Sequence, residues 1–186
     1  MPPRPPAGDW LKVAILALAA VLAAAPSRAE DTAVVRGAAA VIDATHLDIA
    51  GRRFKLYGID APDIDETCSD AAGKDYPCGI QARAALAELI KDGTVACLPR
   101  GVDQSNEPLG ACSVGKLDLA QALIDAGWAI ADRARTLYYE KAEEQARTTQ
   151  HGLWQGPFVP PAAWRAGERV PQSHTGGTGI YRQKLF

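Results

Sequence analysis

The sequence contains no apolar run long enough to cross a lipid bilayer. Its longest stretch without a polar side chain is Val13–Ala25, which would span about 20 Å as a helix, against the ~30 Å of the hydrocarbon core. The sequence also lacks a basic excess, with 20 Lys and Arg against 22 Asp and Glu. Proteins that grip nucleic acid by its phosphates usually carry such an excess on one face, and the bulk charge here does not supply it. The remaining composition, 47% hydrophobic and 23% charged, is typical of a globular domain rather than a disordered chain.

Residues 1–29 have the organisation of a cleaved secretory signal. Two basic residues flank the start of the apolar run, and the small-x-small sequence Ser27–Ala29 follows it as a cleavage site. An uncleaved anchor helix is the alternative. Cleavage would leave a chain with 17 basic and 21 acidic residues and no further membrane span, in the periplasm or outside the cell. We predict one domain over residues 30–165 and a flexible tail over 166–186, which shows no periodicity.

An even number of cysteines favours disulfides over a metal site. Cys68, Cys78, Cys97 and Cys112 contain no C-x-x-C pair, and the three histidines are scattered, which argues against zinc. In an exported chain four cysteines would pair, and three connectivities are possible. We favour Cys68 with Cys78 and Cys97 with Cys112, because both pairs are local and the second joins two segments with the pattern of neighbouring strands.

The hydrophobic pattern predicts an α+β fold that is mainly β. Short strands are bounded by turn residues, and three segments have apolar residues at helical spacing. The predicted strands are 34–42, 46–49, 53–57, 94–98 and 109–114, and the predicted helices are 80–90, 117–126 and 137–150. Five strands with a helix inserted after the third favour a five-stranded Greek-key barrel of the oligonucleotide-binding (OB) type, accompanied by three helices.

Seven short motifs occur along the chain in a characteristic order. They are Val41–Asp43, Lys55–Asp63 (KLYGIDAPD), Cys78-Gly79, Val114–Leu119, Ala126–Ala129 (AGWA), Gly152–Phe158 (GLWQGPF) and Pro161–Arg165. Together they resemble the thermonuclease, or staphylococcal-nuclease-like, family over roughly residues 34–165. The resemblance implies the OB-type barrel, in an exported version held by cysteines. It also implies hydrolysis of DNA and RNA phosphodiesters with a calcium ion.

The metal ligands implied by this resemblance are only partly kept. The family's first metal aspartate lies in a Val-x-Asp-Gly-Asp-Thr element, and here Thr45 stands at that position. The earlier acid of the element survives as Asp43, and the second metal aspartate survives as Asp60. Because calcium affinity follows the number and charge of oxygen ligands, we expect calcium binding to be weak or absent.

The implied phosphate and water contacts are also altered. Lys55 replaces the strand arginine, Asp63 replaces the glutamate that activates water, and Glu107 replaces the last arginine. Lysine loses the bidentate geometry of arginine, aspartate is one methylene shorter, and Glu107 reverses the charge. Lys55 and Asp63 are therefore the predicted catalytic residues, in a site that has lost other residues of the family's set.

Three compensating arrangements stay open from the sequence alone. Arg53 could supply a guanidinium from the same strand face as Lys55, Asp65 or Glu66 could return a carboxylate to the metal, and His46 could pair with Asp60. The main hypothesis is an exported, monomeric binding or structural module that has lost most nuclease activity. It would have an unknown ligand and weak or no affinity for nucleic acid. The alternative is a slow metal-dependent phosphodiesterase.

Overall fold

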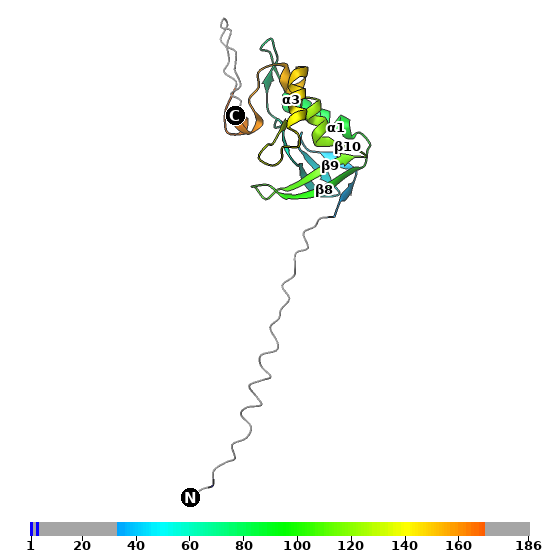
Figure 1. The fold of residues 1–186 in the computed structure, drawn as a ribbon, viewed down its shortest axis with the longest axis vertical. Coiled ribbons are helices and arrows are strands. Elements are labelled where there is room, and N and C mark those ends of the chain that lie inside the picture. The colour runs from blue at the N-terminus through cyan, green and yellow to red at the C-terminus, as the bar shows by residue number, and fades with distance from the viewer. Residues whose placement is uncertain (2, 4–32, 170–186) are drawn as a thin grey trace. The chain divides into compact units, whose positions relative to one another are not determined.

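The computed structural model describes residues 33–169, together with Met1 and Pro3 (Figure 1). The predicted signal peptide and most of the predicted tail lie outside these residues, so both stay predictions. Within residues 33–169 no helix has both the length and the apolar character needed to cross a membrane.

The main sheet has seven strands in the described part of the chain. They are β1 (Val35–Gly37), β2 (Ala39–Val41), β3 (His46–Ile49), β4 (Arg52–Leu56), β8 (Val95–Val102), β9 (Pro108–Val114) and β10 (Leu117–Asp118). Hydrogen bonds run in the order β1-β8-β9-β4-β3-β2, and β10 pairs with β9. The β4–β9 pair is parallel and every other pair in the sheet is antiparallel.

The predicted mainly β fold of OB type is confirmed, but its strand count and closure differ from the prediction. The two end strands of the sheet, β1 and β2, form no ladder with each other, so the sheet is not closed by hydrogen bonds. They are consecutive in the chain and only Ala38 separates them. The predicted first strand, 34–42, is therefore two short strands on opposite edges of the sheet path, because the chain changes partner at this residue from β8 to β3.

Four α-helices are present in the described residues, where the sequence predicted three. They are α1 (Cys78–Ile90), α2 (Leu119–Asp125), α3 (Glu140–Thr149) and α4 (Pro161–Arg165), with a 3₁₀ turn, η1, at Gly152–Gln155. The predicted helix 117–126 begins two residues later, because Leu117 and Asp118 pair with β9 and the Asp118 carboxylate caps α2. The sequence did not predict α4, which is too short to show a helical period.

One apolar core joins the sheet to the longer helices, which gather on one side of it (Figure 1). Leu47 and Phe54 point inward from β3 and β4, alternating with the exposed or half-buried residues of those strands. Leu86, Leu123 and Ala146 close the core from α1, α2 and α3. The barrel mouth that carries the predicted site therefore rests on packed strand ends.

Both predicted disulfides are confirmed. Cys97 on β8 and Cys112 on β9 are direct partners in the ladder and are bonded to each other. Cys68 of β6 (Cys68–Ser69), which pairs with β7 (Asp75–Tyr76), is bonded to Cys78 at the start of α1. Two disulfides are typical of proteins that fold in an oxidising, extracellular compartment.

The Cys68–Cys78 disulfide lies in a second apolar cluster that holds the end of the domain. Its buried members are Cys68, Cys78, Leu153 and Phe158. The hydroxyl of Tyr76 donates a hydrogen bond of 3.0 Å to the carbonyl of Gly152, next to this cluster. The segment that leads into α4 is therefore packed against the disulfide.

Gly79, in the first turn of α1, allows the preceding loop to pass directly against the helix. A Cβ atom at this position would overlap the backbone carbonyl of Asp63. The backbone N–H of Gly79 also donates a hydrogen bond of 3.2 Å to the carbonyl of Glu66. The loop that carries Asp63 is therefore placed by a close backbone contact.

Gly79→Ala is predicted to destabilise the domain by about 2 kcal/mol or more, the range of overpacking in a close contact. In a helix without such a contact, glycine to alanine would stabilise it by up to ~1 kcal/mol, so the sign of the change is diagnostic. Urea unfolding of the oxidised chain measures it, and Ala84→Gly on the exposed face of α1 is the control, with an expected loss of about 1 kcal/mol. A Gly79→Ala variant as stable as the parent would contradict the close contact.

Candidate functional site

A tight turn before β3 holds the carboxylate of Asp43 in place. Its Oδ1 accepts hydrogen bonds from the backbone N–H groups of Thr45 (2.7 Å) and His46 (2.8 Å) and from the Thr45 hydroxyl (3.1 Å). This is the pattern by which aspartate stabilises a turn. Thr45 is only 6% exposed. The residue at the family's first metal position is therefore buried and hydrogen-bonded to its neighbour.

His46 bridges two carboxylates that are far apart in the sequence. Its Nδ1 lies 2.7 Å from Oδ2 of Asp43, and its Nε2 lies 3.1 Å from Oε2 of Glu107. Burial lowers the pKa of His46, but the hydrogen bonds and charges of Asp43 and Glu107 outweigh it and raise the pKa above 6.5. Burial raises the pKa of Asp43, yet the contacts with His46 and Thr45 lower it to about 2. We call Asp43, Thr45, His46 and Glu107 the His46 cluster.

Lys55, the predicted phosphate-binding cation, is paired inside the domain. It lies opposite His46 in the β3–β4 ladder, and its Nζ is 3.6 Å from Oδ2 of Asp103. Asp103 also accepts hydrogen bonds from the backbone N–H groups of Ser105 (2.8 Å) and Glu107 (2.9 Å), which lower its pKa together with Lys55. The same turn therefore neutralises Lys55 and presents Glu107 to His46.

Asp60 and Asp63 are bound by an arginine from the C-terminal helix. The Nη2 of Arg165 lies 2.8 and 2.6 Å from the two oxygens of Asp60, and Nη1 lies 3.0 Å from Oδ1 of Asp63. Burial lowers the pKa of Arg165, whereas both aspartates raise it, so the guanidinium stays charged. The predicted metal ligand and the predicted water-activating group thus share one internal cation.

Glu66 lies behind this arginine and is almost fully buried, at 1% exposure. Its Oε2 accepts a hydrogen bond of 3.2 Å from the backbone N–H of Asp63. Burial raises the pKa of Glu66 to about 7, and the charges of Asp63 and Asp60 add to the rise while Arg165 opposes it. We call Asp60, Asp63, Glu66 and Arg165 the Arg165 cluster.

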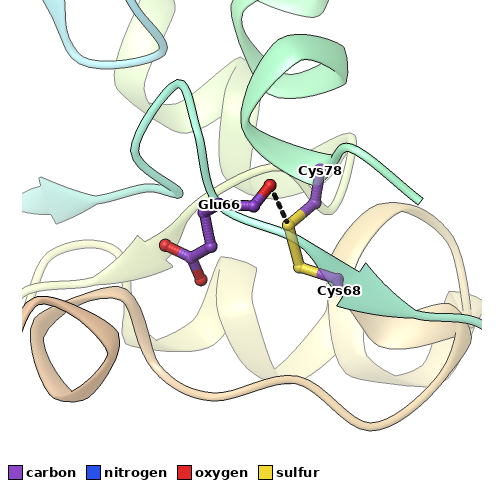
Figure 2. Close-up of side chains that lie close together, drawn as sticks. All are labelled: Glu66, Cys68 and Cys78. Atoms are coloured by element: carbon purple, nitrogen blue, oxygen red, sulfur yellow. Dashed lines mark hydrogen bonds between the residues drawn. A yellow bond between two sulfur atoms is a disulfide. The ribbon is translucent and has the colours of Figure 1, made fainter. Parts of the chain in front are cut away.

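One group of potential metal ligands in the described residues lies next to this cluster, and it is already occupied by a covalent bond. Glu66, Cys68 and Cys78 have ligand atoms within 4.8 Å of one another. Figure 2 shows that Cys68 and Cys78 form the disulfide and that the Glu66 carboxylate points away from it. The 3.4 Å contact between Sγ of Cys78 and the Glu66 carbonyl carries no proton, because a disulfide sulfur has none. Disulfide sulfurs are not thiolates, so this group does not hold a metal.

The structure therefore brings most of the predicted site residues together as two clusters, and Lys55 pairs separately with Asp103. Within residues 33–169 no side-chain hydrogen bond or ion pair joins the His46 cluster to Asp60 or Asp63, so the alternative in which His46 pairs with Asp60 is not formed. His46 bonds instead to Asp43, three residues away, whose turn presents it. Arg53 and Asp65 are exposed and belong to neither cluster.

Sequence reasoning missed Arg165 and Asp103. Arg165 lies more than a hundred residues from its partners, and no local pattern signals such a contact. Asp103 was not among the predicted site residues. The Asp103 carboxylate accepts hydrogen bonds from the backbone N–H groups of Ser105 and Glu107. Aspartate commonly forms such Asx turns, and this tendency is the signal that could have identified Asp103 from the sequence.

The calcium ion implied by the resemblance does not fit this arrangement. Calcium takes six to eight oxygen ligands, several of them carboxylates. Here Oδ1 of Asp43 accepts three hydrogen bonds, the Thr45 side chain is neutral and engaged, and Asp60 and Asp63 hold Arg165. The oxygens at the family's positions are therefore already taken by groups of this chain.

Comparison with known proteins bears on the origin of this site. A family model described as staphylococcal nuclease homologue matches residues 53–156. The chain belongs to the staphylococcal nuclease family. It is also 33% identical over 135 residues to the succinoglycan biosynthesis protein ExoI of Rhizobium meliloti (strain 1021), and the alignment covers 70% of each protein.

The family match includes Lys55, Asp60, Asp63 and Glu107, and it ends before α4. The resemblance deduced from the motifs is thereby confirmed. Arg165 lies outside the matched range.

The pairing of His46 with Asp43 is predicted to contribute most to stability between about pH 4 and 6.5. A histidine with a raised pKa stabilises the fold fully below its ordinary value of 6.5, and this contribution is lost as pH rises through the raised value. Asp43, lowered from 3.8 to about 2, stabilises above pH 3.8, and its contribution is lost as pH falls through 2. Urea unfolding across pH 3–9 measures both limbs.

His46→Gln should flatten the alkaline limb of this profile, whereas His151→Gln, at an exposed position, should leave it unchanged. An alkaline limb of equal slope in parent and His46→Gln would show that the imidazole does not carry the effect.

Proposed function

We propose that this chain is an exported nuclease-family domain that has lost calcium-dependent phosphodiester cleavage and acts as a binding module. The observation that carries the proposal is the bond between Glu107 and His46. A phosphodiesterase must place cations where negative charge develops on the phosphate. Here the aligned position holds a carboxylate that is fixed toward the strand by an imidazole.

The electrostatics around this position support the same proposal. Lys55 is the one cation kept from the family's phosphate contacts, and Asp103 lies 3.6 Å from its Nζ. An incoming phosphate would have to compete with that carboxylate and would meet Glu107 beside it. Because affinity for single strands depends on neutralised phosphates, we expect weak or no binding of nucleic acid at physiological salt.

A slow metal-dependent phosphodiesterase is the second candidate. It is favoured by the survival of Asp60 and by the carboxylate of Asp63 and the cation of Lys55, which stand at family positions with altered residue types. It would need a metal ion to displace Arg165 from both aspartates and a phosphate to displace Asp103 from Lys55. Losing one stabilising donor typically costs about 10²–10³ in rate, so activity near that of other members of the family is not expected.

The purified, oxidised chain is predicted to cleave single-stranded DNA near background in the presence of calcium, because the site lacks a free phosphate clamp. Release of acid-soluble nucleotides measures this. A rate typical of an active nuclease, abolished by Asp60→Ala, would overturn the proposal.

The double variant Thr45→Asp with Glu107→Arg tests the alignment behind the proposal. It restores one carboxylate and one guanidinium at the family's positions, so DNA binding in calcium should strengthen by about tenfold or more, the scale of one charge-assisted contact. Fluorescence anisotropy with labelled single-stranded DNA reports it. Asp125→Arg, an exposed charge reversal on α2, controls for net charge alone.

For the ligand of the module we propose a carbohydrate. OB-type barrels bind oligosaccharides as well as oligonucleotides, and the name of the relative ExoI refers to succinoglycan biosynthesis. The domain also carries an aromatic ring paired with an arginine: the Arg100 guanidinium is 5.9 Å from the Tyr57 ring, whose hydroxyl donates to the carbonyl of Arg135. Tyr138, three residues further on, is 74% exposed. Rings of this kind stack on sugars without needing a basic surface.

A neutral β-glucan oligosaccharide is predicted to bind more tightly than single-stranded DNA of similar length. Tyr138→Ala should weaken that binding by about tenfold, on the scale of one aromatic contact, without loss of stability. Ile80→Ala, another exposed apolar residue, is the control. NMR titration measures both, and absence of any glucan binding would reject the carbohydrate ligand while leaving the loss of nuclease activity to its own assay.

A further inference from the structure

Helix α4, which carries the last of the family-resembling motifs, brings a cation to the family's metal position. The match ends at residue 156, and α4 spans Pro161–Arg165. Arg165 is the last residue of this helix, and its guanidinium contacts Asp60 and Asp63 at 2.6–3.0 Å. The contact spans the two carboxylates with one planar group, which is the geometry that arginine forms better than lysine.

The position of α4 is fixed by buried packing. Phe158, three residues before the helix, is buried beside the Cys68–Cys78 disulfide, and its ring meets Trp154 edge to face at 5.1 Å. Val159 and Pro161 are also buried. A Cβ at Gly156 would overlap the backbone of Ser69 and Asp70, so this segment runs against the disulfide hairpin. The arginine is therefore delivered by an anchored segment.

The carboxylates would be costly to leave without a cation. Arg165 contacts both Asp60 and Asp63, and the buried Glu66 accepts a hydrogen bond from the backbone N–H of Asp63. Neighbouring carboxylates repel one another when ionised, so a positive charge among them is favourable. A divalent cation bridging Asp60 and Asp63 would have to occupy the space that the guanidinium fills.

We propose that Arg165 replaces the divalent cation at this site, so that α4 acts as an internal counter-ion strap and excludes metal ions from Asp60 and Asp63. This proposal rests on the proposed function, because it concerns the same carboxylates. It describes metal binding only, so it holds whether or not the domain retains slow cleavage. It makes two statements: the two aspartates retain affinity for a divalent cation, and Arg165 masks that affinity.

The test is calcium binding to the full oxidised chain by titration calorimetry, with terbium(III) luminescence as an independent probe. Arg165→Gln should bind calcium at least about tenfold more tightly than the parent, because the competing charge is gone. Arg169→Gln is the matched control: Arg169 stacks on Trp164 at 4.2 Å and bonds only to backbone carbonyls in the described structure, so its loss should leave calcium affinity unchanged.

Thermal unfolding provides a second readout. Without metal Arg165→Gln should unfold at a lower temperature than the parent, and millimolar calcium should raise its midpoint while leaving that of the parent unchanged. If this variant folds only when calcium is present, that result supports the strap. Arg165→Lys keeps one charge but cannot span both aspartates, so its calcium affinity should fall between those of the parent and Arg165→Gln.

Two results would overturn the proposal. One is equal calcium affinity in the parent, Arg165→Lys and Arg165→Gln, which would mean that Arg165 does not compete with metal. The other is tighter calcium binding in Arg165→Gln that persists when Asp60→Asn and Asp63→Asn are added, which would place the metal elsewhere. A nuclease assay decides neither, so failure of the strap and failure of the proposed function are separable.

Discussion

The disulfide between Cys68 and Cys78 fixes the relative positions of three segments on which the candidate site depends. It ties the β6–β7 hairpin to the first residue of α1, and the loop with Asp63 is held against the same helix start at Gly79. Leu153 and Phe158 pack on the sulfur atoms and carry the chain toward α4. Since the acidic loop and the arginine that neutralises it converge on this one bond, the geometry of the Arg165 cluster is a consequence of covalent anchoring more than of the ion pairs themselves.

Several partly buried charges of this domain are balanced by ion pairs within it. His46 serves two carboxylates, and Arg165 serves two more. Away from the candidate site, the buried carboxylate of Glu143 likewise forms ion pairs with two arginines, Arg133 and Arg147. Removing one member of such a group leaves a buried charge without its partner, which is destabilising even where the pair itself contributes little. The site residues that differ from the family pattern therefore contribute to the stability of the domain.

The sequence predicted what local pattern controls. Alternation in His46–Ile49 and Arg52–Leu56 identified two strands, and the short spacing of the cysteines identified both disulfides, because these features depend on neighbours in the chain. The contacts of Arg165 with Asp60 could not be predicted, since a packed C-terminal segment brings them together and no period or motif encodes the distance. From the sequence, His46 was only a possible partner of Asp60. Its bridge to Glu107 depends on the turn at Asp103, whose shape is set by side-chain to backbone hydrogen bonds that composition does not reveal.

The two end strands of the sheet have a consequence for how the chain reaches this fold. β1 and β2 lie on either side of Ala38, yet β1 pairs with β8, some sixty residues later, with Val35 opposite Cys97. During synthesis β1 emerges first and has no partner until β8 follows. A strand with unpaired backbone groups is prone to pair with other chains, and contacts of large sequence separation form slowly. The backbone groups of Val35–Gly37 therefore stay without their sheet partners until residues 95–97 have been synthesised.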